Sequence, residues 1–221
     1  MAGRVLGIAG PFAAESDTSP NPFTDLALNV TFTHESGAPR YQVPGYFAAD
    51  GDAANTSAQS GDQWRVNFAP DETGTWNYIA SFRSGTDVAI SASPTAGSPS
   101  HFDGAGGSFV IGPTDKTGRD HRGKGRLQYV GKHHLQFAGS KEYFLKAGPD
   151  SPETLMAFSD FDNTSTGKPD KGPLKTWAPH VADWREGDPT WKGGLGKGII
   201  GALNYLASKG MNTYYSLTMN V

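Results

Sequence analysis

The last third of the chain concentrates aromatic rings, carboxylates and one histidine in a single stretch between Gly148 and Gly193. Flat indole rings can stack on the faces of sugar rings, while imidazole and carboxylate groups can hydrogen-bond hydroxyls. Two carboxylates on one face can also hold a ligand or a cation. The alternative is that the tryptophans only pack this stretch onto the rest of the protein. The candidate substrate-binding residues are Asp160, Asp162, Trp177, His180, Asp183, Trp184 and Trp191.

Regular elements flank this stretch on both sides. Residues 141–148 have the composition of a strand, and residues 211–219 have that of a second strand. Between them, apolar residues recur at helical spacing and predict a helix over 198–210 that stops at its final glycine. Strand, helix, strand is one βα unit, and in a barrel of such units the loops after the strands lie on the catalytic face. A connection of about forty residues is far above the usual length, so we expect it to line or rim a site.

The first half of the sequence has a different period. Apolar and polar residues alternate in short segments, as is typical of half-buried strands, and turn residues separate the segments. Trp64 and Trp76 are in phase with apolar neighbours, which favours the core over a sugar-stacking surface. Such a series predicts an immunoglobulin-like antiparallel β-sandwich. The expected strands are 26–33, 41–47, 63–68, 75–82 and 107–111.

Together these patterns predict a mainly β protein with three regions. Residues 1–113 form the sandwich, and residues 114–140 form a polar linker with a hairpin over 126–137. Residues 141–221 form the first βα unit of a TIM barrel, cut short at the second strand. A single βα unit cannot complete a sheet, so the sequence reads as the front part of a larger enzyme.

Composition excludes several classes of protein. The chain has 221 residues with 29 glycines and 15 prolines, which favours many turns. Its net charge is −3, from 19 basic and 22 acidic residues without a basic stripe, so we expect no nucleic acid partner. No apolar run has spanning length, so we expect no membrane partner. Cysteine is absent, which excludes disulfides and thiolate sites, and the glycines at 193–198 lack the phosphate-loop pattern. We expect no cofactor and no metal, and leave the oligomeric state open.

Several short motifs resemble a known group of bacterial proteins. In the first half, the motifs look like an uncharacterised amino-terminal sandwich domain found on glycoside hydrolases, some of which also carry a collagen-binding domain. In the second half, the motifs resemble the start of the barrel in those proteins. The first set is Asn21–Asp25, Thr31–His34, Val43–Phe47 and Pro70–Trp76; the second is Phe144–Gly148, Asp183–Trp184, Gly187–Trp191, Gly196–Gly201 and Leu217–Asn220.

The resemblance implies a secreted or periplasmic glycoside hydrolase that acts on a polysaccharide or oligosaccharide. Such enzymes use two carboxylates that flank the scissile bond. The resemblance places these on later barrel strands, beyond Val221, so no residue here is assigned a catalytic role and the chain alone is expected to be inactive. The rival interpretation is a non-catalytic carbohydrate- or matrix-binding module.

Overall fold

The computed structural model describes residues 4–93, 95–149, 155–165 and 174–215. The protein is mainly β, with antiparallel sheets and few helices. It divides into two compact units. The first comprises Met1–Ala53 and Ala58–Phe144, and the second comprises Ala54–Ser57 and Leu145–Val221.

One sheet of the first unit has the order β1-β5-β4, all antiparallel. It contains β1 (Arg4–Ala14), β5 (Ser60–Phe68) and β4 (Tyr46–Phe47). Strand β5 extends the strand predicted at 63–68, whereas β1 was not predicted. Its sequence mixes glycine and alanine with apolar residues and Phe12 is 72% exposed, so no clean alternation marks it.

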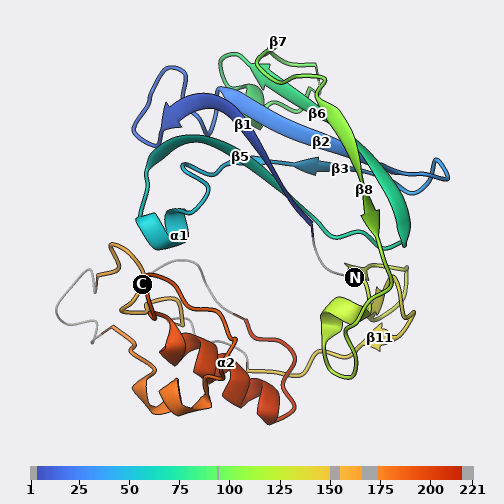
Figure 1. Ribbon diagram of the computed structural model, residues 1–221. Helices are drawn as coiled ribbons and strands as arrows, with labels where there is room; N and C mark the ends of the chain where they lie inside the picture. The colour runs from blue at the N-terminus through green and yellow to red at the C-terminus, as the bar shows by residue number, and fades with distance from the viewer. Residues whose placement is uncertain (1–3, 94, 150–154, 166–173, 216–221) are drawn as a thin grey trace. The chain divides into compact units, whose positions relative to one another are not determined.

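The second sheet has the order β3-β2-β6-β7, with β8 also paired to β6. Its strands are β2 (Leu26–His34), β3 (Arg40–Pro44), β6 (Gly74–Ser84), β7 (Ser98–Pro99) and β8 (Gly106–Ile111). Figure 1 shows β2, β3 and β6 in one layer and β1 and β5 in the layer that faces it. The predicted strands at 26–33, 75–82 and 107–111 are therefore confirmed.

The strand predicted at 41–47 is two strands in different sheets, because the chain crosses from β3 to β4 at Gly45. The Gly45 N–H donates to the Leu28 carbonyl at 2.8 Å. A Cβ at this position would lie 2.4 Å from Leu28 Cδ2, so only glycine allows so close a crossing.

A single aromatic-rich core lies between the two sheets. Trp64 and Trp76 are 1% and 0% exposed, which confirms that both belong to the core. Phe32 and Phe68 stack with their ring centroids 4.1 Å apart. The fully or nearly fully buried members from both sheets include Leu28, Val30, Phe32, Trp64, Val66, Phe68, Trp76, Ala80 and Phe82.

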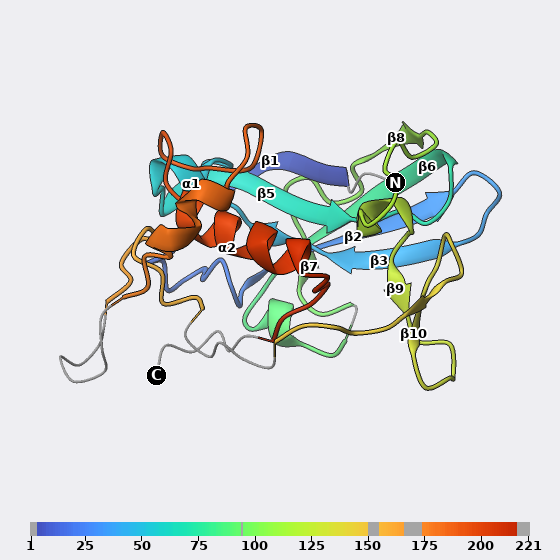
Figure 2. The same cartoon turned by 90° about the horizontal axis from the view of Figure 1, so that it is seen from below.

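Residues 112–144 belong to the first unit and are irregular. Short strands β9 (Leu127–Gln128), β10 (Leu135–Phe137) and β11 (Tyr143–Phe144) form a small antiparallel sheet, which confirms the predicted hairpin. The strand predicted at 141–148 is reduced to the two residues of β11, paired antiparallel to β10. Figures 1 and 2 label these strands.

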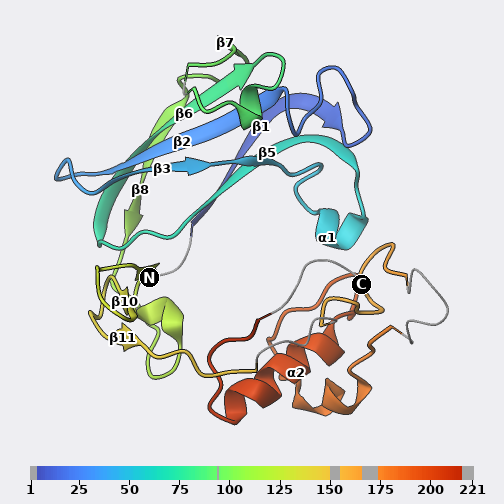
Figure 3. The same cartoon turned by 180° about the vertical axis from the view of Figure 1, so that it is seen from behind.

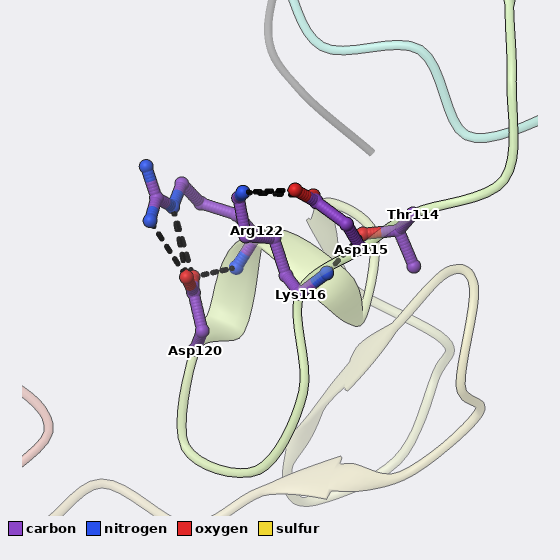
Figure 4. A network of polar contacts seen from close by, with 5 residues as sticks. All are labelled: Thr114, Asp115, Lys116, Asp120 and Arg122. Carbon is purple, nitrogen blue, oxygen red and sulfur yellow. Dashed lines mark hydrogen bonds and ion pairs between the residues drawn. The ribbon is translucent and has the colours of Figure 1, made fainter.

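A polar network organises the turn that precedes this small sheet. In the one-turn 3₁₀ helix η2 (His121–Gly123), the Arg122 guanidinium donates to Asp120 from Nη2 at 2.6 Å and from Nε at 2.9 Å (Figure 4). The Arg122 backbone N–H donates to the same carboxylate at 3.1 Å. The Arg122 side chain, with this backbone bond, lowers the pKa of Asp120 to about 2.

The second unit is built on one helix. Helix α2 (Lys197–Ser208) confirms the predicted helix, with Gly210 in the left-handed region just beyond it. The 3₁₀ helix η4 (Ala178–Asp183) packs against α2. A one-turn helix, α1 (Ala53–Thr56), also lies mostly within this unit. No helix in the described ranges is long and apolar enough to cross a membrane.

The strand predicted at 211–219 is not regular over 211–215, and its remainder lies outside the described residues. Residues 212–215 are joined to residues 145–149 by backbone hydrogen bonds and also by the side chain of Asn212. Its Oδ1 accepts from the Ala147 N–H at 2.8 Å and its Nδ2 donates to the Leu145 carbonyl at 2.9 Å. The Ala147 N–H and the Leu145 carbonyl are thus bound to a side chain and not to backbone groups, so the repeating ladder that defines a strand is interrupted.

Candidate functional site

The face of α2 that meets the long loop includes two buried glycines. Gly198 and Gly201 are buried, and a Cβ on Gly201 would lie 1.8 Å from the His180 carbonyl oxygen. A Cβ on Gly198 would lie 2.3 Å from the Thr176 carbonyl oxygen. These two glycines bring the backbone of η4 into direct contact with the helix. In Figure 3 the two elements lie side by side.

The structure divides the seven predicted residues into two groups. Trp177, His180, Asp183 and Trp184 lie on or beside η4. Asp160, Asp162 and Trp191 lie near the amino-terminal end of α2, where Asp160 and Gly196 are in contact. Both Trp177 and Trp191 pack on the small apolar cluster of Leu155, Phe158 and Ile199.

The first group centres on a histidine oriented by a carboxylate. His180 Nδ1 lies 3.0 Å from Asp183 Oδ2, one turn along η4. Because a carboxylate only accepts, Nδ1 carries the hydrogen in this pair. The imidazole also packs on Tyr205 of α2, with a centroid distance of 4.9 Å. In the neutral ring, Nε2 is then a hydrogen-bond acceptor, and it has no partner among the described residues.

The rings beside this histidine are half-buried. Lys197 places its ammonium 4.3 Å from the centroid of the Trp184 ring, and the Trp184 indole N–H donates to the Pro189 carbonyl at 3.4 Å. Trp177 adopts a left-handed conformation with φ of 51°. Its indole nitrogen is buried and has no hydrogen-bond partner among the residues that the structure describes. Such an unpaired donor is costly, and a ligand oxygen is one group that would satisfy it.

A second carboxylate fixes the turn that follows η4. Asp188 Oδ2 accepts from the Arg185 N–H at 2.8 Å and from Asn204 Nδ2 at 2.7 Å. These hydrogen bonds lower the pKa of Asp188 below its ordinary value. The bond from the Arg185 N–H has the larger effect, and the bond from Asn204 has the smaller one. Asn204 also donates to the Asp183 carbonyl at 2.9 Å. This amide therefore ties the candidate site to α2.

The second group is engaged within the protein. Asp160 accepts from the Gly196 N–H at 2.9 Å, at the amino-terminal end of α2, and its carbonyl accepts from the Trp191 indole N–H at 3.1 Å. The Trp191 ring stacks on Phe161 at 5.5 Å between centroids. Gly196 has φ of 92°, and a Cβ there would lie 2.0 Å from the Trp191 ring.

The carboxylate of Asp162 is also hydrogen-bonded to other side chains of the protein. Its carboxylate accepts from Lys192 Nζ at 2.5 Å and from Ser57 Oγ at 2.6 Å, both in the second unit. The pKa of Asp162 lies below its ordinary value, mainly because of the hydrogen bond from Lys192 and to a smaller extent because of the one from Ser57. Residues 159–163 form turns, so Asp160 and Asp162 do not lie on one face of an extended segment. The described residues contain no cluster of three metal-ligating side chains.

Sequence reasoning missed the residues that hold the site from α2. Lys197 and Asn204 are seven positions apart, which places them on one face of α2 with Gly201 between them, although Lys197 lies just before the predicted helix. This spacing was a usable signal. Lys192 and Ser57 had none, because their contact with Asp162 joins segments far apart in the sequence.

One comparison with known protein families matches the first half of the chain. Residues 9–83 match a family described as a domain of unknown function, DUF5060. This range contains the four motifs of the first half that carry the resemblance to an uncharacterised domain. No curated protein matches the sequence.

Among solved structures, the chain is similar to a "putative glycoside hydrolase from Bacteroides vulgatus ATCC 8482". The two are 20% identical and superpose with a TM-score of 0.42. The similarity covers 69% of this chain and 22% of the other, so this chain spans less than a quarter of that protein.

Proposed function

We propose that these 221 residues are the amino-terminal part of a polysaccharide-degrading glycoside hydrolase that works outside the cytoplasm. In this proposal, residues 1–113 are an immunoglobulin-like β-sandwich and residues 114–140 are a linker and hairpin. Residues 141–221 are the first βα unit of a (β/α) barrel, and their long loop contacts the glycan.

The hydrogen bonds on either side of α2 support the βα assignment. The Ala147 carbonyl accepts from the Asn212 N–H at 2.7 Å, and the Pro149 carbonyl accepts from the Tyr215 N–H at 3.3 Å. Both partners advance in the same direction along the chain, so the two segments run parallel with a helix between them. A Cβ on Gly148 would lie 1.6 Å from the Thr213 carbonyl oxygen, so a side chain would separate these segments.

The observation that carries the proposal is the group formed by His180, Asp183 and Trp184. It offers an oriented nitrogen acceptor and a carboxylate that can accept from hydroxyls, beside an indole ring that can pack on a sugar. The three residues follow the segment at 147–149, where a barrel would place its site loops. Hydrogen-bond acceptors beside an aromatic surface suit a polyhydroxylated ligand, and the Asp183 carboxylate disfavours an anion.

Catalysis is proposed to come from outside these residues. A glycosidase needs two carboxylates that flank the scissile bond. In the described part of the loop, Asp160, Asp162 and Asp188 accept hydrogen bonds that fix the local backbone or side chains. Asp183 orients His180. These contacts support positioning roles for the loop carboxylates.

Calorimetric titration of the whole chain with soluble oligosaccharides tests the proposal. We use cellohexaose, xylohexaose and mannohexaose, and compare Trp184→Ala with Trp184→Phe. We expect at least one hexasaccharide to bind, with affinity reduced tenfold or more by Trp184→Ala and largely kept by Trp184→Phe, since the latter keeps a ring. Equal affinity of Trp184→Ala and the parent chain would refute the assignment of this loop.

A further inference from the structure

A pocket lies within the first unit, beside strand β2. It consists of two hollows of about 200 and 250 Å³ that share Ala27, Asn29 and Ala89 as lining residues. We call the two together the β2 groove. It starts where β3 ends at Pro44, since β2 residues before Asn29 have no β3 partner. The groove is therefore a gap at the edge of the sheet and continues over the outer side of β2.

The walls of the groove are fixed by one carboxylate. Asp25 Oδ2 accepts from the Asn21 N–H and Asp25 Oδ1 accepts from the Asp87 N–H, both at 3.0 Å. The first bond closes the turn that carries Phe23, and the second holds the turn that leads into the 3₁₀ helix η1 (Val88–Ile90). The Ala89 N–H donates to the Thr24 carbonyl at 2.8 Å, which joins the two turns directly. The groove is therefore formed before any ligand binds.

Two aromatic rings form the rim of the first hollow. Phe23 is 54% exposed and Tyr46 is 44% exposed, so both rings offer apolar surface to a ligand in this hollow. Phe23 packs edge-on against Phe47 at 6.4 Å, and Phe47 in turn contacts the buried Trp64 at 5.4 Å. Phe23 is thus supported by the core, while part of the surface of both rings faces solvent.

The second hollow offers neutral polar groups. The side-chain amides of Asn29 and Gln42 line it, and neither makes a hydrogen bond within the described ranges of the chain. Among the described residues that line it, Arg83 carries the charged side chain. Its guanidinium donates to the carbonyls of Ala96, Thr95 and Gly97, at 2.6, 3.0 and 2.5 Å. Arg83 therefore holds the wall, and the groove offers amides and hydroxyls without a free charge.

We propose that the β2 groove binds a neutral oligosaccharide, with a sugar ring against Phe23 and Tyr46 and sugar hydroxyls on the amides of Asn29 and Gln42. Aromatic surface with a few free amide groups suits a ligand that has apolar ring faces and many hydroxyls. The absence of a free cation in the described lining argues against a phosphate or an acidic peptide. The inference stands independently of the loop site in the second unit.

The test uses the whole chain carrying Trp184→Ala, so that binding at the second-unit loop does not contribute. Cellohexaose, xylohexaose and mannohexaose are titrated while backbone amide signals are followed by NMR. We expect one of them to shift the amides of Ala27, Asn29 and Ala89, with at least tenfold weaker binding in Tyr46→Ala and in Asn29→Ala. Tyr46→Phe is the matched control, since it keeps the ring and loses only a 3.5 Å contact with Asn67.

Three results would overturn the inference. One is that no neutral hexasaccharide shifts these amides, and another is that Tyr46→Ala and Asn29→Ala bind as well as the parent chain. The third is preferential binding of an oligogalacturonate or of an unrelated extended peptide, which would assign the groove to another ligand class. Ile79→Ala, at an outward position of β6 that is 62% exposed, controls for general effects of substitution.

Discussion

The two units of this protein are stabilised in different ways. The first unit encloses a continuous core of large side chains between two antiparallel sheets, with Trp64, Trp76 and several phenylalanines almost completely buried. Among the described residues of the second unit, the buried apolar cluster consists of Leu155, Phe158 and Ile199. Around this cluster, carboxylates and amides hold loop backbone through individual hydrogen bonds.

This difference indicates how each unit could present a binding site. A sheet with a large core tolerates a groove at its edge, because the remaining contacts keep the strands in place. A loop held by single hydrogen bonds can present polar side chains, but the loss of one contact should release a whole segment. We therefore expect substitutions in the first unit to change global stability, and those in the second unit to act locally.

The largest effect is expected for Trp76→Ala in the first core. The side chain is 0% exposed and its indole N–H donates to the Glu72 carbonyl at 3.1 Å. Removing it leaves a cavity and an unpaired carbonyl, and should lower the free energy of unfolding by about 3–5 kcal/mol. Urea denaturation followed by tryptophan fluorescence measures this. Ile79→Ala on the exposed face of the same strand should cost far less, and equal losses would contradict the assigned core.

A smaller effect is expected for Gly201→Ala in α2. At an ordinary helix position this change stabilises by up to about 1 kcal/mol. Here the new Cβ would lie 1.8 Å from the His180 carbonyl oxygen, so η4 must move away. We expect a loss of about 1–3 kcal/mol, together with faster proteolysis of the second unit.

Ser208→Ala provides the control for Gly201→Ala, since it is exposed on the same helix. Its free energy of unfolding should change little, and proteolysis of the second unit should keep the parent rate. A stabilised Gly201→Ala variant would mean that η4 does not pack on this face of α2.

Asp160→Ala tests a single polar contact of the second unit. The carboxylate accepts from the Gly196 N–H at the start of α2, a position where a negative charge also favours the helix. Its loss should destabilise α2 by about 1 kcal/mol. Hydrogen exchange of the α2 amides would report this as local opening, with amides of β2 and β6 unaffected. An equal change in both units would show that the second unit does not open by itself.

The smallest effect is expected for the contact between Asp120 and Arg122. This contact lies in the first unit, but like those of the second unit it consists of individual polar bonds. The pKa of Asp120 lies at about 2 against an ordinary 3.8, chiefly because of Arg122. A lowered pKa means that the contact is present above the ordinary value and is lost as the pH falls through 2. NMR titration of the Asp120 carboxyl carbon should give that low midpoint, and Arg122→Ala should return it towards 3.8. A parent midpoint near the ordinary value would exclude the network in Figure 4.

The sequence was most informative where one face of an element is buried. Alternation in β2, β5 and β6 and the helical spacing in α2 identified these elements because each has one face on a core. It failed at β1, which lacks alternation, and at Gly45, where a close contact with Leu28 redirects the chain.

The contacts of the candidate site could be predicted only where the two residues are close in the sequence. His180 and Asp183 are near neighbours, so their pairing could be anticipated from sequence. The engagement of Asp160 with Gly196 and of Asp162 with Lys192 depends on contacts across about thirty positions of irregular chain. No local periodicity encodes such contacts, whereas the three-dimensional structure shows them directly.

The most direct test of the proposed glycan site is an NMR titration that follows the indole N–H signal of Trp184, assigned by its absence in Trp184→Phe. Cellohexaose, xylohexaose and mannohexaose are added to the whole chain. The account predicts that one of them shifts the Trp184 signal with saturation, while the signal of the buried Trp76 stays in place. A Trp184 signal that does not respond to any of the three sugars would contradict the proposal that this loop contacts a neutral glycan.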